Sequence, residues 1–282
     1  MAEWVPGGDS AMSKVNNIII LPELEELKAE VERLRTELSV LMLERDELKF
    51  VICKNIEAEY MLKLGGLEYK AYEAQCNVLR LKRQLELMQA SLNRQEPVIM
   101  TVVENLLNTE FAEYQEKLDE QVGKMNEAIE RSNADVLPEE ETKELKKLYR
   151  KIVKALHPDM NPNITDAQRQ LFDDAVAAYK NGDLDTLRAI EGMIGDDDLQ
   201  MDQADAKAKL LEEKEKLEKL IEEVREEIQT IKSEYPYTMK ELLADEAKVE
   251  ERKRELELII SKYEEMAGIY KARIDELMKK VV

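Results

Sequence analysis

The stretch PEEETKELKKLYRKIVKALHPDMNPNIT, residues 138–165, predicts two amphipathic helices joined by a short loop. Pro138 and the glutamates after it are typical of a helix start, because proline fits the first turn and acidic side chains favour the positive end of the helix dipole. Apolar residues then recur at helical spacing up to Leu156. Pro158 fixes its own φ and restricts His157, so the loop is expected to present its polar side chains in a defined way.

A second helix is expected directly after this loop. Thr165 and Gln168 have the spacing of a capping box, in which each side chain accepts a hydrogen bond from the backbone N–H of the other residue. The apolar face of this helix comprises Ala167, Leu171, Phe172, Ala175, Val176 and Tyr179. Gly182 is expected to end the helix and Asp183 to cap a further short one, which completes a module at residues 138–195.

The first helix of this module is basic, although the whole chain carries a formal charge of -20. Between residues 143 and 154 a single Glu144 accompanies the basic residues Lys143, Lys146, Lys147, Arg150, Lys151 and Lys154. A basic patch on an acidic protein can steer one acidic partner to one face. The alternative is a solvated helix face without a partner, and charge alone favours that interpretation.

Coiled-coil seams precede the module, because apolar residues recur there at alternating spacings of three and four. Residues 1–21 are expected to form a mobile tail. Residues 22–96 are expected to form a coiled-coil hairpin folded about Gly65-Gly66, since paired glycines weaken helix propensity. Only Arg45 interrupts the first seam, which comprises Leu24, Leu27, Val31, Leu34, Leu38, Leu41, Leu48 and Ile52.

The two cysteines of the chain, Cys53 and Cys76, lie symmetrically about the expected turn. They should therefore lie at the same level of the hairpin and form a crosslink on mild oxidation. Without a disulfide framework or an apolar segment of signal-peptide length, the chain is expected to be cytoplasmic and its thiols buried and reduced.

Three further segments complete the expected organisation. Residues 98–133 are predicted to form a helix that leads into the module and packs on it. Residues 196–205 are acidic and are expected to be a linker. Residues 206–282 repeat the apolar seam and are predicted to form an antiparallel coiled-coil arm, folded back at Pro236. The expected fold class is therefore all-α, with long coiled-coil helices and helical hairpins around a central helical hairpin.

Composition excludes several classes of function. The net charge of -20 argues against binding to nucleic acids and to anionic membranes, since both need a basic surface. His157 is the only histidine, and no paired cysteine motif, nucleophile signature or phosphate-cradling glycine motif accompanies it. No catalytic residue, metal site or cofactor is therefore expected.

The stretch YRKIVKALHPD, residues 149–159, resembles the second helix and signature loop of DnaJ-type J domains. Phe172 and the pair Ala178-Tyr179 stand at the spacing of the third helix of that family. The joint match of basic helix, loop and aromatic spacing is far more specific than the tripeptide His-Pro-Asp alone. The resemblance covers about a fifth of the chain.

This resemblance implies a J-domain cochaperone that docks on a DnaK-type chaperone and stimulates ATP hydrolysis by that partner. The coiled coils would direct the protein to a client or an assembly. The chain itself is not expected to be an enzyme, because the ATP site belongs to the partner. The activating loop would comprise His157, Pro158 and Asp159, and charged docking would come from Lys147, Arg150, Lys151 and Lys154.

The sequence departs from the family in two places. The short first helix with its Tyr-Leu signature is missing directly upstream, and the end of the preceding helix near Met125 and Ile129 is expected to pack in its place. The basic fourth helix is replaced by residues 183–190. The alternative function is therefore a coiled-coil scaffold or assembly protein with a structural, non-stimulating module, and a homo-oligomer formed through the coiled coils is compatible with both functions.

Overall fold

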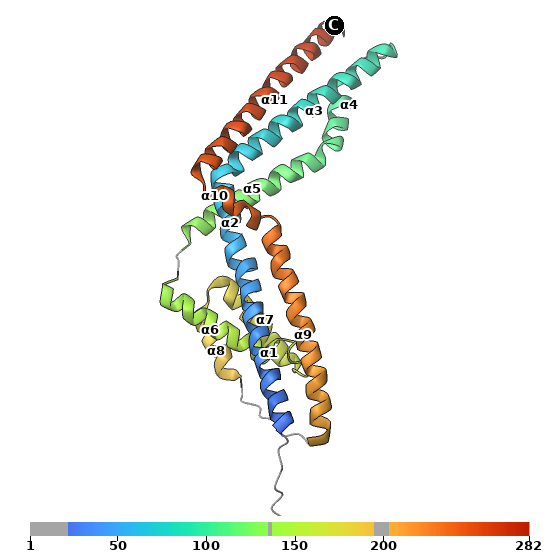
Figure 1. The fold of residues 1–282 in the computed structure, drawn as a ribbon. Helices are drawn as coiled ribbons and strands as arrows, with labels where there is room; N and C mark the ends of the chain where they lie inside the picture. The colour runs from blue at the N-terminus through green and yellow to red at the C-terminus, as the bar shows by residue number, and fades with distance from the viewer. Residues whose placement is uncertain (1–21, 135–136, 195–202, 282) are drawn as a thin grey trace, which may run out of the picture.

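The computed structural model describes residues 22–134, 137–194 and 203–281. All regular secondary structure within these ranges is helical, which confirms the predicted all-α class (Figure 1). The predicted mobile tail and most of the predicted acidic linker lie outside the described residues.

One continuous helix runs through the first third of the chain (Figure 1). It comprises α1 (Pro22–Glu47), the π-helical turn η1 (Leu48–Ile52), α2 (Cys53–Tyr60), the π-helical turn η2 (Met61–Gly65) and α3 (Gly66–Asn93). Both glycines have helical backbone angles, with φ -54° at Gly65 and φ -65° at Gly66. The predicted hairpin about Gly65-Gly66 is therefore wrong.

Close packing explains the glycine at position 65 better than a turn does. A Cβ atom added to Gly65 would lie 3.1 Å from Met61 Sδ and 3.5 Å from Met125 Cγ. The missing side chain lets α5 (Ala112–Asn133) approach the long helix at this point. Gln121 Nε2 on α5 also donates a hydrogen bond to the Gly65 carbonyl oxygen at 3.4 Å.

The continuous helix also overturns the predicted cysteine crosslink. Cys53 and Cys76 lie on the same helix, and a rise of about 1.5 Å per residue separates them by roughly 35 Å. That distance is far above the bridging limit of about 7 Å between Cα atoms. Both thiols are free and buried.

The C-terminal helices pack in parallel along the long helix and do not fold back on each other. α9 (Gln203–Ser233) follows α1, with ion pairs from Lys207 to Glu23 at 2.9 Å and from Lys232 to Glu44 at 2.8 Å. α11 (Glu246–Val281) follows α3 towards the same end of the molecule (Figure 1).

The predicted antiparallel C-terminal arm is therefore wrong. Its two seams pack on successive parts of the N-terminal helix, and the short elements η3 (Tyr237–Met239) and α10 (Lys240–Leu243) join them. This junction lies beside the π-helical turns, where Lys63 Nζ donates to the Leu243 carbonyl oxygen at 3.2 Å. A heptad pattern specifies an apolar seam but leaves its partner open.

Residues 98–133 form two helices, α4 (Met100–Glu110) and α5. They run back along α3 towards α2, and Arg131 Nε donates to Asn55 Oδ1 at 2.7 Å. Met125 packs in the apolar cluster around η2, whereas Ile129 is 47% exposed. The prediction that this segment packs on the module is wrong, because α1 occupies that place.

The module consists of α6 (Glu139–Leu156), α7 (Asp166–Asn181) and α8 (Leu184–Met193). Its core continues without interruption into α1 and α9. Fully or almost fully buried members of this shared core are Leu38, Met42, Tyr149, Ile152, Val153, Ala175, Leu187 and Leu217. The module is therefore built onto the long helix and has no separate core.

Candidate functional site

Local interactions form the helical hairpin of the module as the sequence predicts. Thr165 caps α7, because its backbone N–H donates to Gln168 Oε1 at 2.8 Å and its Oγ1 accepts from Gln168 N at 3.3 Å. Gly182 ends α7 in the left-handed region with φ +70°. Asp183 caps α8 by accepting from Thr186 N at 3.0 Å. The predicted capping box, helix end and cap are thus confirmed.

A tight turn after α6 holds the His157-Pro158-Asp159 loop. The His157 carbonyl oxygen accepts from the backbone N–H of Met160 at 3.1 Å and from that of Asn161 at 2.9 Å. The Asn161 side chain donates to the Lys154 carbonyl oxygen at 3.1 Å, which closes the last turn of the helix. The loop is therefore ordered by its own hydrogen bonds.

The residues of this loop differ in exposure. His157 is only 8% exposed, and its ring lies edge-on to Phe172 with centroids 5.0 Å apart. The Asp159 side chain is 59% exposed. Met160 is also buried and belongs to the core. His157 therefore anchors the loop from within, whereas Asp159 faces solvent.

The environment of His157 favours its neutral form. Burial lowers the pKa of His157 from its ordinary value of 6.5, and nearby Arg45 lowers it further, although the charge of Asp159 opposes this shift. His157 Nδ1 accepts a hydrogen bond from the Asp159 backbone N–H at 3.2 Å. In the neutral ring the proton therefore lies on Nε2.

The four predicted docking residues lie together on the outward face of α6. The opposite face packs into the core and comprises Leu145, Tyr149, Ile152, Val153 and Leu156. Lys147 and Arg150 are exposed and form no ion pair with any residue that the structure describes. The side chains of Lys151 and Lys154 are 65% and 39% exposed, respectively. Helical spacing joins these cations into one basic stripe, composed of Lys147, Arg150, Lys151 and Lys154.

Acidic side chains form ion pairs with the lysines at both edges of this basic stripe. On the α1 side, Lys154 Nζ lies 2.8 Å from Glu32 Oε2 and donates to Thr36 Oγ1 at 3.3 Å. On the α8 side, Lys151 pairs with Glu191. An acidic partner that binds the stripe must therefore compete with two carboxylates of the same chain.

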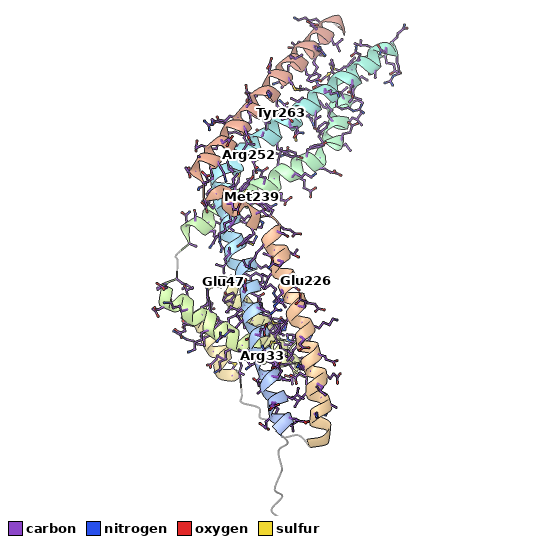
Figure 2. The ribbon with its side chains drawn as sticks, in the orientation of Figure 1. Arg33, Glu47, Glu226, Met239, Arg252 and Tyr263 are labelled. Carbon is purple, nitrogen blue, oxygen red and sulfur yellow. The ribbon has the colours of Figure 1, made fainter. Side chains whose placement is uncertain are left out.

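A buried polar contact fastens α6 to α1. The Tyr149 hydroxyl donates to Asp46 Oδ2 at 2.7 Å, and Arg45 Nε donates to Asp46 Oδ1 at 2.9 Å. Asp46 is only 4% exposed, and the Tyr149 ring stacks on Tyr179 with centroids 4.1 Å apart. Burial and the neighbouring Asp46 both raise the pKa of the Tyr149 phenol. Lys146 also pairs with Glu47 of α1, a residue labelled in Figure 2.

The sequence prediction missed the role of Asp46 and its partners. The available signal was the interruption of the first seam at Arg45. A charged residue within an apolar seam indicates a buried polar partner. Here that partner of the Arg45–Asp46 pair is the Tyr149 hydroxyl. Tyr149 lies 103 residues away from Asp46 in the sequence, so the spacing of residues alone could not identify this contact.

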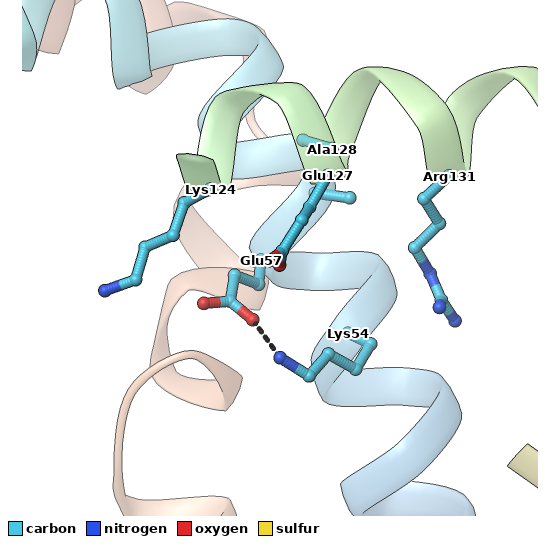
Figure 3. Close-up of a pocket in the computed structure, with 7 residues that line it drawn as sticks. Lys54, Glu57, Lys124, Glu127, Ala128 and Arg131 are labelled. Carbon is cyan, nitrogen blue, oxygen red and sulfur yellow. Dashed lines mark hydrogen bonds and ion pairs between the residues drawn. The ribbon is translucent and has the colours of Figure 1, made fainter. Parts of the chain in front are cut away.

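A small cavity lies between α2 and α5, away from the module (Figure 3). Its cations already have partners: Lys54 pairs with Glu57 at 2.8 Å, Lys124 with Glu120 at 2.8 Å, and Arg131 donates to Asn55. Both lysines are therefore neutralised by carboxylates of the same chain, whereas Arg131 meets only a neutral amide and the lining carboxylate of Glu127 forms no ion pair with any described residue.

The chain has no match among models of protein families, curated proteins or solved structures. No helix within the described residues is long and apolar enough to cross a lipid bilayer.

Proposed function

We propose that this protein is a J-domain cochaperone, which docks on a DnaK-type chaperone and stimulates ATP hydrolysis by that partner. The chain contributes no catalytic group of its own in this proposal. It works in the cytoplasm, and its long helices direct the chaperone to a protein client or assembly.

One observation carries the proposal: exposed Asp159 lies on the ordered loop directly after α6, the helix whose outward face carries the basic stripe. This arrangement offers a partner a row of cations next to a carboxylate on an ordered loop. The charge of the stripe is opposite to that of the chain as a whole, so the stripe is where an acidic partner would be steered. Buried His157 supports the loop from within.

A specific observation favours the alternative function, a coiled-coil scaffold with a structural module. The module shares its apolar core with α1 and α9, as expected of a structural part of a helical scaffold. α1 packs on α6 in the place that the first helix of a J domain would take, and Glu32 of α1 already pairs with Lys154. Under this alternative the loop joins two helices and has no effect on ATP hydrolysis.

Single-turnover ATP hydrolysis by a DnaK-type chaperone separates the two functions. Wild-type protein should accelerate hydrolysis, and Asp159→Asn should abolish the acceleration while leaving the circular dichroism and melting temperature unchanged, because Asp159 is exposed. Asp173→Asn, which removes the same charge from the exposed surface of α7, is the matched control and should stimulate fully. Absence of stimulation by saturating wild type, with a chaperone that responds to another J protein, would leave the scaffold.

A further inference from the structure

A second apolar face lies on α11, on the side away from α3. Leu256, Ala267 and Ile274 form the buried face of this helix. The second face comprises Leu258, Ile259, Met266 and Ile269, which are 56%, 37%, 42% and 50% exposed. At about 100° per residue these four side chains fall within one third of the helix circumference. They form an exposed apolar stripe that is interrupted by Lys262, and such a stripe is typical of a surface that another helix covers.

Most charges along the C-terminal part of α11 also lack partners within the chain. The last ion pairs along α11 join Arg252 to Glu255 at 2.9 Å and Lys253 to Glu250 at 2.6 Å. Beyond Glu255 the charged side chains of α11 form no ion pair with any other described residue. Figure 2 shows Arg252 and Tyr263 on this extended helix. The apolar stripe and the charges beyond Glu255 are thus free to meet a partner, and the exposed carboxylate of Glu255 would be shared between Arg252 and that partner.

The α11 stripe is complementary to itself when a second copy runs in the opposite direction. With a two-fold axis at Glu264, Glu255 of one copy faces Arg273 of the other, and Ile259 faces Ile269. Glu255 and Arg273 lie at the same angular position on the helix, because 18 residues complete five turns. A parallel pair would instead place each of these charges against its own copy. Charge complementarity therefore favours a second copy in antiparallel orientation.

The position of this axis allows almost complete overlap of the two helices. Glu264 lies at the middle of α11, a helix of 36 residues that is about 54 Å long. We propose that the exposed face of α11 is a homodimer interface, in which two copies pair antiparallel. Because α1 and the module extend from the N-terminal end of α11, the dimer would carry its two modules at opposite ends (Figure 1). This inference is independent of the cochaperone function.

Charge reversal in the full-length chain tests the pairing. Sedimentation equilibrium should give twice the chain mass of 32.7 kDa for wild type. Glu255→Arg and Arg273→Glu should each raise the dimer Kd about tenfold or more, because symmetry breaks two ion pairs at once. The double exchange should restore the wild-type Kd. Glu257→Arg introduces the same change on a different face of α11 and should leave the Kd unchanged.

Two further measurements cover the apolar contact and the orientation. Leu258→Ser combined with Ile269→Ser should give a monomer with unchanged helix content, since both side chains are exposed in the single chain. Spin labels at Lys279 should lie about 45 Å apart along an antiparallel pair and within about 20 Å in a parallel one. A wild type that is monomeric at about 0.1 mM, single reversals without effect, or the short distance would overturn the proposal.

Discussion

The Tyr149→Phe substitution tests whether the buried contact between α6 and α1 holds the module in place. It removes one hydroxyl and keeps the ring that stacks on Tyr179. Asp46 then loses a hydrogen bond of 2.7 Å in a position where only 4% of the residue is exposed. Arg45 remains to neutralise the carboxylate, with its Nε at 2.9 Å.

The cost of Tyr149→Phe in unfolding free energy follows from the kind of hydrogen bond that it removes. A hydrogen bond to a charged group contributes about 1.5–3 kcal/mol, and water has little access to replace it here. We therefore expect Tyr149→Phe to lower the free energy of unfolding by about 2 kcal/mol. Tyr179→Phe is a matched control, because the Tyr179 hydroxyl is buried and has no hydrogen-bond partner among the described residues. That change should be neutral, or stabilising by up to about 1 kcal/mol.

Urea unfolding followed by circular dichroism gives both free energies of unfolding. Asp46→Asn and the double variant with Tyr149→Phe complete a cycle, and we expect a coupling energy of about 1–3 kcal/mol because the two side chains are in direct contact. If Tyr149→Phe costs no more than Tyr179→Phe, the hydroxyl contact does not hold α6 on α1. A coupling energy near zero would lead to the same conclusion.

Two more predictions concern the docking surface and its loop. Glu32→Gln should tighten binding of an acidic chaperone by about two- to fivefold at low salt, because it frees exposed Lys154, and the gain should shrink as salt rises. Glu30→Gln, on α1 and paired with Arg33, is the control in a binding titration, and equal effects of the two changes would show that only net charge matters. For His157, the folded-state pKa lies below its ordinary value of 6.5, so the stability it contributes is present above pH 6.5 and is lost as pH falls below it. The loss should be at most about 1.4 kcal/mol per pH unit. It is measured as the difference in unfolding free energy between wild type and His157→Gln as a function of pH. Parallel pH profiles of the two proteins would refute this prediction.

Local features of the fold were predictable because their physical causes are local. The Thr165 capping box, the glycine at position 182 and the Asp183 cap each depend on residues within one turn. The outward position of the basic stripe also follows from helical spacing within α6 alone. These features define the surface that the proposed function uses.

Long-range features were not predictable from the same patterns. The glycines at 65 and 66 favour a break in the helix, because glycine has a low helix propensity. The close packing of Met125 against helical Gly65 stabilises the helix by more than this low propensity costs. The C-terminal seams likewise match either an antiparallel arm or a parallel contact with the first helix, because apolar periodicity is the same in both. Ion pairs such as Lys207–Glu23 appear only once the parallel partner is known.

The burial of His157 changes how the loop should be interpreted. A substitution of His157 changes both the packing and the hydrogen bonding of the loop, because the ring packs against Phe172 and its Nδ1 accepts a hydrogen bond from the Asp159 backbone N–H. Loss of stimulation in a His157 variant would therefore follow equally from a displaced loop and from a lost contact with a partner. Asp159 donates its backbone N–H to His157, while its exposed carboxylate lies 3.8 Å from His157 Nδ1, beyond hydrogen-bond distance, so the carboxylate can be replaced by an amide without removing a packing contact. The carboxylate of Asp159 is accordingly the group whose removal separates signalling from folding.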